Sequence, residues 1–452
     1  MRLTLPILLL LLLAPRVDAQ DVDVSPIPIA SPGGLDSLEV HAGRTVHAVV
    51  LPTGLVTKDY VILREIHTRP GQPFDPETLR DDVQRLENLS IFAEVTVAVR
   101  PDSTDGVGVA FGFREMPRIV PMLAFRYTEE DGFSIGPGVS SLNFGGRAVA
   151  LSGRAYFGAA DQYWARATWP WISGNHVSFE AYAGRLVRFD KRNDFQEESD
   201  EVYARTGKYL GDHGRLSGRA WFLQMHSDED GITLSPDNMD QLFGLYVTAG
   251  LDTRDSWRVP RSGWQNEIEL GKVGGFLPGE GDFESLVLDV RRWLPTGRTM
   301  KLQLSGLLSM QSGTVGVDVP LYMRYQIGGA NSVRGYPVQG PAEALAGKNQ
   351  LLGTAEHSFT LRPIRRYDVF GWSFSVGLDA VALADAGLAW NNDAEFALDR
   401  VRTGFGGGLR LLVPGSEMLR FEVAWNGHND EIQVQFHFAS GSKAAAQRSR
   451  NR

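Results

Sequence analysis

The chain has 452 residues, a formal net charge of -9 at pH 7 and no cysteine. The acidic balance argues against nucleic acid as a partner, because binding to a phosphate backbone needs a basic surface. Without disulfides, an exported chain of this length must draw its stability from a large core or a closed sheet.

The N-terminus has the pattern of an export signal. Arg2 precedes an apolar run from Leu5 to Ala14, and small residues end the segment at Ala19. This run is far shorter than the roughly 20 residues of a membrane-spanning helix, so residues 1–19 are predicted to be a signal peptide, with a buried helix as the alternative. Residues 20–42 are rich in Pro, Ser and Asp and are predicted to be a linker. No later stretch is long enough for a spanning helix, which leaves a soluble protein or a β-barrel.

Residues 43–116 have the pattern of a small α+β domain with the order β-α-α-β-β. A first helix is expected from a cap at Thr57 to about His67. Asp75 is expected to cap a second helix, which has a proline at its first position. The strands are expected at about residues 46–51, 93–100 and 107–114. Apolar residues at intervals of four and then three positions fall on one face of a helix. They predict the buried stripe of the second helix: Leu79, Val83 and Leu86.

Residues 117–438 alternate between apolar and polar side chains with a period of two. Between Phe374 and Trp390 every even position is apolar, whereas Asp379 and Asp385 fall on the other face. Long strands with charged residues on one face favour a lipid-facing exterior and a wet lumen over the alternative of a soluble sandwich. The turn signals predict a transmembrane β-barrel of about 16 antiparallel strands.

The connections between these strands alternate in length, as in outer-membrane barrels. Short turns such as Gly145-Gly146 are expected at one end. The acidic cluster Glu197-Glu198-Ser199-Asp200-Glu201 is expected in an outer loop, as solvated charge rather than as a cation site. Residues 439–452 contain several basic residues and are predicted to be a disordered periplasmic tail. The longer connections are expected at about residues 190–199, 227–240 and 311–346.

Chemical motifs give no sign of an active site. The chain has no H-E-x-x-H or Walker sequence, and its nine histidines are scattered. We therefore predict no catalytic residues, no cofactor and no metal site, and a protein that is not an enzyme.

The glycine-rich segment 328–340 places one charged residue, Arg334, between two alternating segments. Its sequence Val333-Arg334-Gly335-Tyr336 resembles the inward-folded V-R-G-F/Y loop of the BamA/TamA-like family, outer-membrane barrels that insert or export other proteins. Gly353-Thr354-Ala355-Glu356 and Ala384-Asp385-Ala386-Gly387 are similar to the family's G-x-x-E and F-x-D-x-G patterns. The resemblance implies that Arg334 folds into the lumen and pairs with Glu356 and Asp385, which both lie on the polar face of their strands.

Other segments carry the same resemblance. Asp252-Thr253-Arg254-Asp255 with Pro260 and Gly263 is similar to the family's turn motif, and Gly404 to Arg410 is similar to its glycine-rich strand. Residues 43–116 look like a single POTRA domain, although Ser90-Ile91 stands where that domain usually has a glycine. The terminal aromatic signal of the family is internal here, because 14 residues follow Phe438.

The resemblance implies an outer-membrane insertase or translocase. Its partners would be the lipid bilayer, unfolded client proteins and, through the POTRA domain, a periplasmic protein, with the POTRA domain and the C-terminal tail in the periplasm. The first strand, about Ile119 to Tyr127, would form a weak seam with the last strand, Glu431 to Phe438. Pro121 in the first strand cannot donate to a hydrogen-bond ladder. The alternative is a passive outer-membrane pore or surface antigen without insertase activity.

Overall fold

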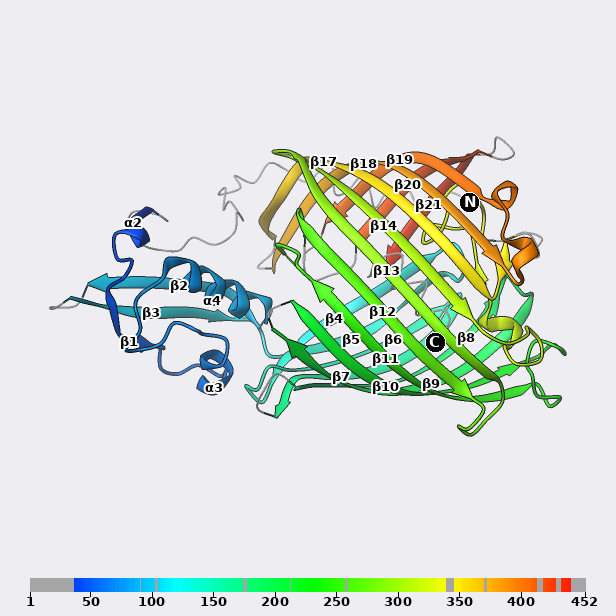
Figure 1. Ribbon diagram of the computed structural model, residues 1–452, viewed down its shortest axis with the longest axis horizontal. Helices are drawn as coiled ribbons and strands as arrows, with labels where there is room; N and C mark the ends of the chain where they lie inside the picture. The colour runs from blue at the N-terminus through cyan, green and yellow to red at the C-terminus, as the bar shows by residue number, and fades with distance from the viewer. Residues whose placement is uncertain are drawn as a thin grey trace.

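The computed structural model describes residues 36–89, 91–101, 105–173, 177–211, 213–256, 259–338, 345–369, 372–412, 418–427 and 432–439. A small N-terminal α+β domain lies beside one end of a large barrel (Figure 1). We call the barrel end that faces this domain the near end, and the opposite end the far end. The predicted signal peptide, residues 20–35 of the predicted linker and residues 440–452 of the predicted tail lie outside the described residues.

The N-terminal domain has the predicted β-α-α-β-β order after one additional short helix. Its elements are α2 (Asp36–Glu39), β1 (Thr45–Val50), α3 (Asp59–Leu63), α4 (Pro76–Asn88), β2 (Phe92–Pro101) and β3 (Gly106–Glu115). The sheet has the order β1-β3-β2, with β1 parallel and β2 antiparallel to β3. The outer side of β1 is partly occupied by residues 71–74, whose backbone groups bond to it. β2 is the other outer strand.

Helix α4 begins as its capping residue predicts. The Asp75 carboxylate accepts hydrogen bonds from the backbone N–H groups of Glu77 at 3.1 Å and Thr78 at 3.3 Å. These bonds satisfy donors that a helix N-terminus otherwise leaves unpaired. The predicted stripe of Leu79, Val83 and Leu86 is confirmed, since all three side chains are buried in the apolar core of the domain.

Two features of the domain differ from the prediction. Helix α3 begins at Asp59 and ends at Leu63, so Thr57 does not cap it and the helix does not reach His67. The Thr57 hydroxyl and backbone N–H instead donate to the Glu115 carboxylate, at 2.5 and 2.7 Å. The segment predicted as linker contains helix α2, because Leu38 packs into the apolar core of the domain.

Sixteen strands form a closed antiparallel barrel, which confirms the predicted fold class. Consecutive strands pair with each other, except that β14 pairs with β17 and β21 closes the ring against β4. The strands are β4 (Val120–Thr128), β5 (Gly132–Phe144), β6 (Val149–Gly158), β7 (Ala160–Ser173), β8 (Val177–Asp190), β9 (Phe195–Leu210), β10 (Gly214–Ser227), β11 (Met239–Asp252), β12 (Gly263–Gly274), β13 (Asp282–Gly297), β14 (Met300–Gln311), β17 (Asn349–Val369), β18 (Trp372–Trp390), β19 (Arg402–Leu412), β20 (Met418–Asn426) and β21 (Ile432–Ala439).

The two faces of the barrel wall differ as the alternation predicts. In β18 the side chains of Asp379 and Asp385 are buried on the inner face, whereas Ala382 and Ala386 are exposed on the outer face. Large apolar side chains are exposed on the outside of many strands, including Leu123, Val247, Leu270 and Phe405. So much exposed apolar surface is stable when it faces lipid. Among the described helices, none is long and apolar enough to cross a membrane.

The acidic cluster Glu197 to Glu201 lies in strand β9, so its predicted place in a loop is wrong. Strands β8 and β9 pair as far as Asp190 and Phe195, and only residues 191–194 connect them. The acidic side chains fit into a strand because arginines on β8 lie opposite them. The ion pairs join Arg185 to Glu198 at 2.8 Å and to Asp200 at 2.7 Å, and Arg188 to Glu197 at 2.8 Å.

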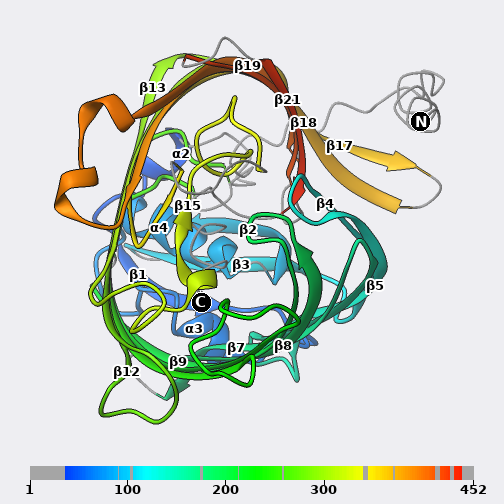
Figure 2. The same cartoon turned by 90° about the vertical axis from the view of Figure 1, so that its right-hand side faces the viewer.

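The connection between β14 and β17, residues 312–348, which we call the long loop, enters the barrel. Figure 2, which looks from the far end, shows its described part inside the ring of strands. The loop contains η1 (Leu321–Met323), β15 (Tyr325–Gln326) and β16 (Ala346–Gly347). Its residues Val319 and Met323 pack in an apolar cluster with Trp221, Met225 and Leu242 of the wall. The long loop therefore occupies part of the lumen.

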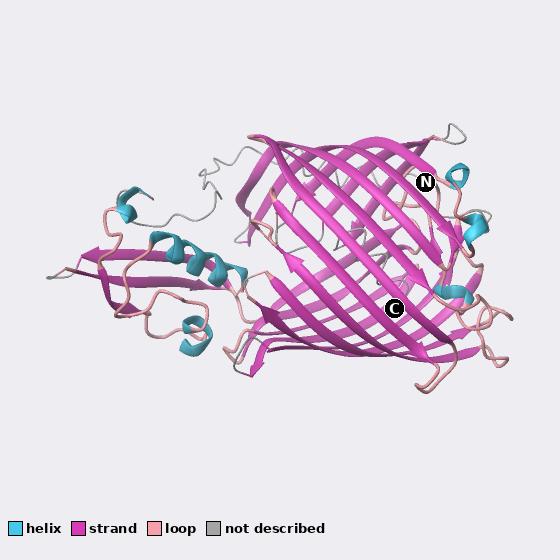
Figure 3. Ribbon diagram, in the orientation of Figure 1, coloured by secondary structure: helices cyan, strands magenta, loops and turns pink. Residues whose placement is uncertain are grey.

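The N-terminal domain lies at the near end of the barrel (Figure 3). A chain of hydrogen bonds joins the two. Asn143, at the end of β5, donates from Nδ2 to the Thr57 hydroxyl at 2.7 Å, and its Oδ1 accepts from the Ala148 backbone N–H at 2.8 Å. The Lys58 N–H donates to the Gly146 carbonyl at 2.8 Å. Because Thr57 in turn donates to Glu115, this carboxylate holds the contact together.

We expect this junction to loosen in acid. Burial favours a raised pKa for Glu115, but the hydrogen bonds from Thr57 and the Val56 N–H outweigh it, so the pKa is lowered. A lowered pKa means that the contribution to stability is complete above the ordinary carboxyl range and is lost as the pH falls through the lowered value. Glu115→Gln, which keeps the shape but removes the charge, should cost about 1 kcal/mol at neutral pH.

The distance between one spin label on the N-terminal domain and one on the barrel, measured against pH, tests this expectation, and the cysteine-free chain allows both labels to be placed freely. Glu115→Gln should broaden the distance distribution at neutral pH. Glu94→Gln is the matched control, because Glu94 forms an exposed pair with Arg114 at 3.2 Å. Equal distributions for the two variants would contradict the assigned role of Glu115.

Candidate functional site in the barrel lumen

The tip of the long loop, residues 328–337, lies directly against the inner wall. Gly335 has a φ of +94°, and a Cβ there would lie 2.9 Å from the backbone nitrogen of Asn426 in β20. At Gly404 in β19, a Cβ would lie 1.8 Å from the carbonyl oxygen of Arg334. The backbones of the tip and the wall can touch because neither glycine has a side chain. Val333 and Tyr336, which lie before and after Arg334 in the sequence, are buried in one apolar cluster.

Arg334 is completely buried and binds Asp385 on β18 through a fork of two hydrogen bonds. Its Nε lies 2.6 Å from Oδ2 of Asp385, and its Nη2 lies 2.9 Å from Oδ1. The backbone N–H of Arg334 also donates to Oδ2, at 3.1 Å. A bidentate contact of this kind fixes both the position and the orientation of the guanidinium.

Two more carboxylates complete the environment of Arg334. Its Nη1 lies 2.7 Å from Oε1 of Glu356 on β17 and 3.1 Å from Oε2 of Glu422 on β20. Arg410 on β19 binds the same two glutamates, at 2.7 Å to Glu356 and 2.6 Å to Glu422. The structure thus brings Arg334 together with Glu356 and Asp385, the two residues proposed as its partners. It adds a glutamate and a second arginine between them.

The cluster is balanced in charge. Arg420 on β20 donates to the tip through Asn331 Oδ1 at 2.6 Å and the Ala330 carbonyl at 3.4 Å. Three guanidinium groups (Arg334, Arg410 and Arg420) then match three carboxylates (Asp385, Glu356 and Glu422). Buried charges are tolerated when they are paired, so the loss of Arg334, Arg410 or one of the three carboxylates breaks ion pairs and leaves an uncompensated charge in the wall.

Glu422, Arg410 and Arg420 were not among the residues predicted for this site. A signal for two of them exists in the sequence, because β20 alternates strictly. The odd-numbered positions of β20 are apolar (Leu419, Phe421, Val423 and Trp425), whereas the even-numbered positions include Arg420 and Glu422. Asn426 shares the inward parity and donates to the Gly335 carbonyl at 3.2 Å. This parity places both charged residues of β20 in the lumen.

The predicted turn motif lies at the near end, between β11 and β12. Arg254 binds Asp252 through a fork, at 2.9 Å from Nε and 2.6 Å from Nη2, and Asp255 accepts from the Arg261 N–H at 2.9 Å. The Pro260 carbonyl accepts from Lys301 at 3.0 Å. Gly263 has a φ of +108°, and a Cβ there would lie 2.2 Å from the Thr253 carbonyl oxygen. These contacts stabilise the turn itself, and a functional role for it stays a prediction.

The segment Gly132 to Gly136 matches the letters of the G-x-S-x-G motif of hydrolases. The structure places Ser134 inside strand β5, where its hydroxyl donates to the Ala160 carbonyl at 2.9 Å and accepts from the Ala160 N–H at 3.0 Å. The motif requires a sharp turn between a strand and a helix that exposes the serine. Ser134 is buried in a strand and serves in strand pairing.

Two family models match the chain. One is described as the Omp85 superfamily domain and matches residues 143–443, more than half of the chain. The other, POTRA, described as a surface antigen variable number repeat, matches residues 47–116. The outer membrane protein assembly factor BamA of Nitratidesulfovibrio vulgaris (strain Hildenborough) is 23% identical over 379 residues, which cover 78% of this chain and 45% of that protein. Outer envelope protein 80, chloroplastic, of Arabidopsis thaliana is 24% identical over 440 residues, which cover 86% of this chain and 54% of that protein.

The chain spans about half the length of these curated relatives. Solved structures share the fold, and two of them illustrate it. BamA from Haemophilus ducreyi lacking POTRA domains 1-3 has a TM-score of 0.60 at 16% identity, with 88% of this chain and 84% of that chain covered. CdiB from Escherichia coli has a TM-score of 0.62 at 14% identity, with 88% and 76% covered. Proteins of the BamA and TamA type are non-enzymatic assembly factors, which agrees with the prediction that this chain is not an enzyme. The matched domains and their order identify the chain as an outer-membrane barrel protein of the Omp85 superfamily with one matched POTRA domain.

Proposed function

We propose that the protein is an outer-membrane insertase or translocase of the BamA/TamA type, which helps to insert or export client proteins through a lateral seam between β4 and β21. The observation that carries the proposal is the register at this seam. Among the described residues, one pair, Phe438 with Tyr127, joins β21 to β4, whereas nine pairs join β4 to β5. In addition, Pro121 removes one N–H donor from β4. A ladder with few bonds opens at lower cost than its neighbours, and the opened edges offer backbone groups to an incoming strand.

The POTRA domain supplies a second site for strand addition. Among the residues that the structure describes, its outer strand β2 pairs on one side only, with β3. An extended client segment can bond to such an edge through its backbone, which tolerates many client sequences. We place this domain and the C-terminal tail in the periplasm, where the domain also binds a periplasmic partner. In this arrangement the near end of the barrel is periplasmic and the far end is extracellular.

A lock across the seam tests the proposed function. Paired residues in antiparallel strands have Cα atoms about 4.5 to 5.5 Å apart, within the range that a disulfide can bridge. The double variant Tyr127→Cys and Phe438→Cys should therefore form a disulfide in a chain that has no other cysteine. In liposomes, the reduced variant should accelerate the folding of a denatured small outer-membrane barrel, and the oxidised variant should not.

Two outcomes would contradict the proposal. Equal acceleration by the oxidised and reduced forms would mean that the seam is not the route. Channel conductance without any acceleration in either form would identify a passive barrel. Each single cysteine variant is the control for the effect of the substitution itself.

A further inference from the structure

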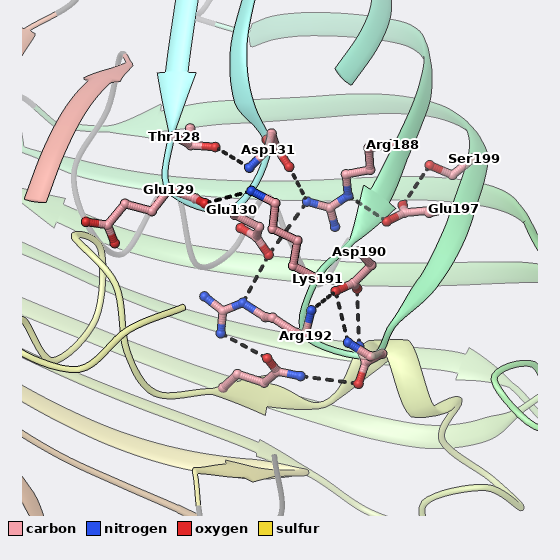
Figure 4. A network of polar contacts seen from close by, with 12 residues as sticks. Thr128, Glu129, Glu130, Asp131, Arg188, Asp190, Lys191, Arg192, Glu197 and Ser199 are labelled. Atoms are coloured by element: carbon pink, nitrogen blue, oxygen red, sulfur yellow. Dashed lines mark hydrogen bonds and ion pairs between the residues drawn. The ribbon is translucent and has the colours of Figure 1, made fainter. Parts of the chain in front are cut away.

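The turn between the first two strands of the barrel is held from inside by the turn between β8 and β9 (Figure 4). Glu130 accepts from Nε of Arg192 at 3.0 Å, and Asp131 accepts from Nη1 of Arg188 at 2.9 Å. Lys191 donates to the Glu129 carbonyl at 3.3 Å. The side chains of Glu130 and Asp131 are almost completely buried. The far end of β4, the first strand of the seam, is thus anchored through buried ion pairs.

The same turn between β8 and β9 also binds the base of the long loop. Nη1 of Arg192 donates to Oε1 of Gln326 at 3.0 Å, and Arg324 donates to Oδ1 of Asn193 at 3.3 Å. Asp190 fixes the turn, since its carboxylate accepts from the backbone N–H groups of Arg192 at 2.8 Å and Asn193 at 3.2 Å. Arg192 therefore contacts Glu130 on one side and the long loop on the other.

The other part of the long loop is bound to the last strands of the barrel. Its tip contacts β20 through Glu422, Arg420 and Asn426. Strand β20 pairs with β21, the last strand of the seam, over eight residue pairs. The long loop thus connects the two sides of the seam through the lumen, by a route that does not use the β21–β4 ladder.

We propose that residues 324–337 of the long loop are a strap that holds the seam closed, with Arg192 as the link that attaches it to the first hairpin. This inference rests on the seam of the proposed function and adds the element that controls it. The strap works in series: β20 holds the tip, Gln326 holds Arg192, and Arg192 holds Glu130. Further contacts lie beside these links, from Arg188 to Asp131 and from Arg324 to Asn193, so breaking one link weakens the attachment of β4 to β20. The interior ion pairs are shielded from solvent, so they are screened by salt less than exposed pairs.

The arrangement in series gives the proposal a sharp test. The rate of disulfide formation between cysteines at positions 127 and 438 reports how often the seam is closed. Glu130→Gln removes the charge that binds Arg192 to the hairpin, and Gln326→Ala removes the contact of Arg192 with the long loop. Each should lower the fraction oxidised during a short exposure to oxidant by about threefold, as expected for the loss of a modest polar contact. The combined variant should slow oxidation by less than the product of the two single effects, because both substitutions act on the same connection.

Arg185→Ala is the matched control, because it removes an arginine from the same hairpin whose exposed ion pairs are with Glu198 and Asp200 of β9. It should leave the oxidation rate unchanged. Heat-modified migration in gels confirms that each variant is a folded barrel. Additive effects of Glu130→Gln and Gln326→Ala, or no effect of either, would overturn the strap. If both variants open the seam but the parent chain does not accelerate client folding, the proposed function fails while the strap stands.

Discussion

Arg334→Ala is expected to destabilise the barrel by about 3 to 5 kcal/mol and to release the tip of the long loop. The variant removes the group that compensates Asp385, Glu356 and Glu422, all of which are buried in the wall. Arg410 remains, but it already binds both glutamates. Two measurements check the expectation: the urea midpoint of barrel unfolding in vesicles, and the thiol reactivity of a cysteine in place of the buried Ser332.

Two variants complete this experiment. Arg334→Lys keeps the charge but cannot form the fork with Asp385, so its midpoint should lie between those of the parent and Arg334→Ala. Arg185→Ala removes an exposed arginine and should cost about 0 to 1 kcal/mol. If Arg334→Ala and Arg185→Ala unfold at the same urea concentration, the buried cluster does not hold the tip.

Gly404→Ala is expected to displace the tip without changing any charge. The added Cβ would lie 1.8 Å from the Arg334 carbonyl oxygen, a backbone atom that cannot rotate away. The tip must therefore leave its place on β19, at a cost of about 1 to 3 kcal/mol. The buried cysteine at position 332 should become reactive in this variant, as it does in Arg334→Ala.

Gly306→Ala is the matched control, because it also changes a glycine in a barrel strand but has no atom within 4 Å of the added Cβ. It should leave both the urea midpoint and the thiol reactivity unchanged. If the cysteine at position 332 stays unreactive in Gly404→Ala, the close fit between the tip and β19 is not needed to hold the tip in place.

The residues that the sequence predicts best are those whose signal is local. Strand parity places Glu356 and Asp385 on the inner face, and the structure has them there, beside Arg334. Asp75 caps α4 because a cap depends only on the next few residues. The barrel itself follows from alternation that runs through nearly 320 residues, which no other fold explains as well.

The residues that escaped prediction depend on contacts between distant parts of the chain. Thr57 has the local pattern of a cap, but Glu115, 58 residues away, takes both of its donors. Glu422 lies 88 residues beyond Arg334, and its parity alone does not tell which strand faces the tip. Glu197 to Glu201 have the composition of a loop, and only the arginines across from them on β8 explain why they form a strand. In each case a tertiary partner outweighs a local preference.

The enclosure of the long loop also dictates the order in which the barrel is built. Arg334 is followed along the chain by all of its carboxylate partners, on β17, β18 and β20. The tip therefore has no complete binding site until the C-terminal strands have formed. Contacts over such separations form slowly. Strands β17, β18 and β20 must therefore be in place before the charges around Arg334 are compensated, which makes the seating of the tip a late step in the folding of the barrel.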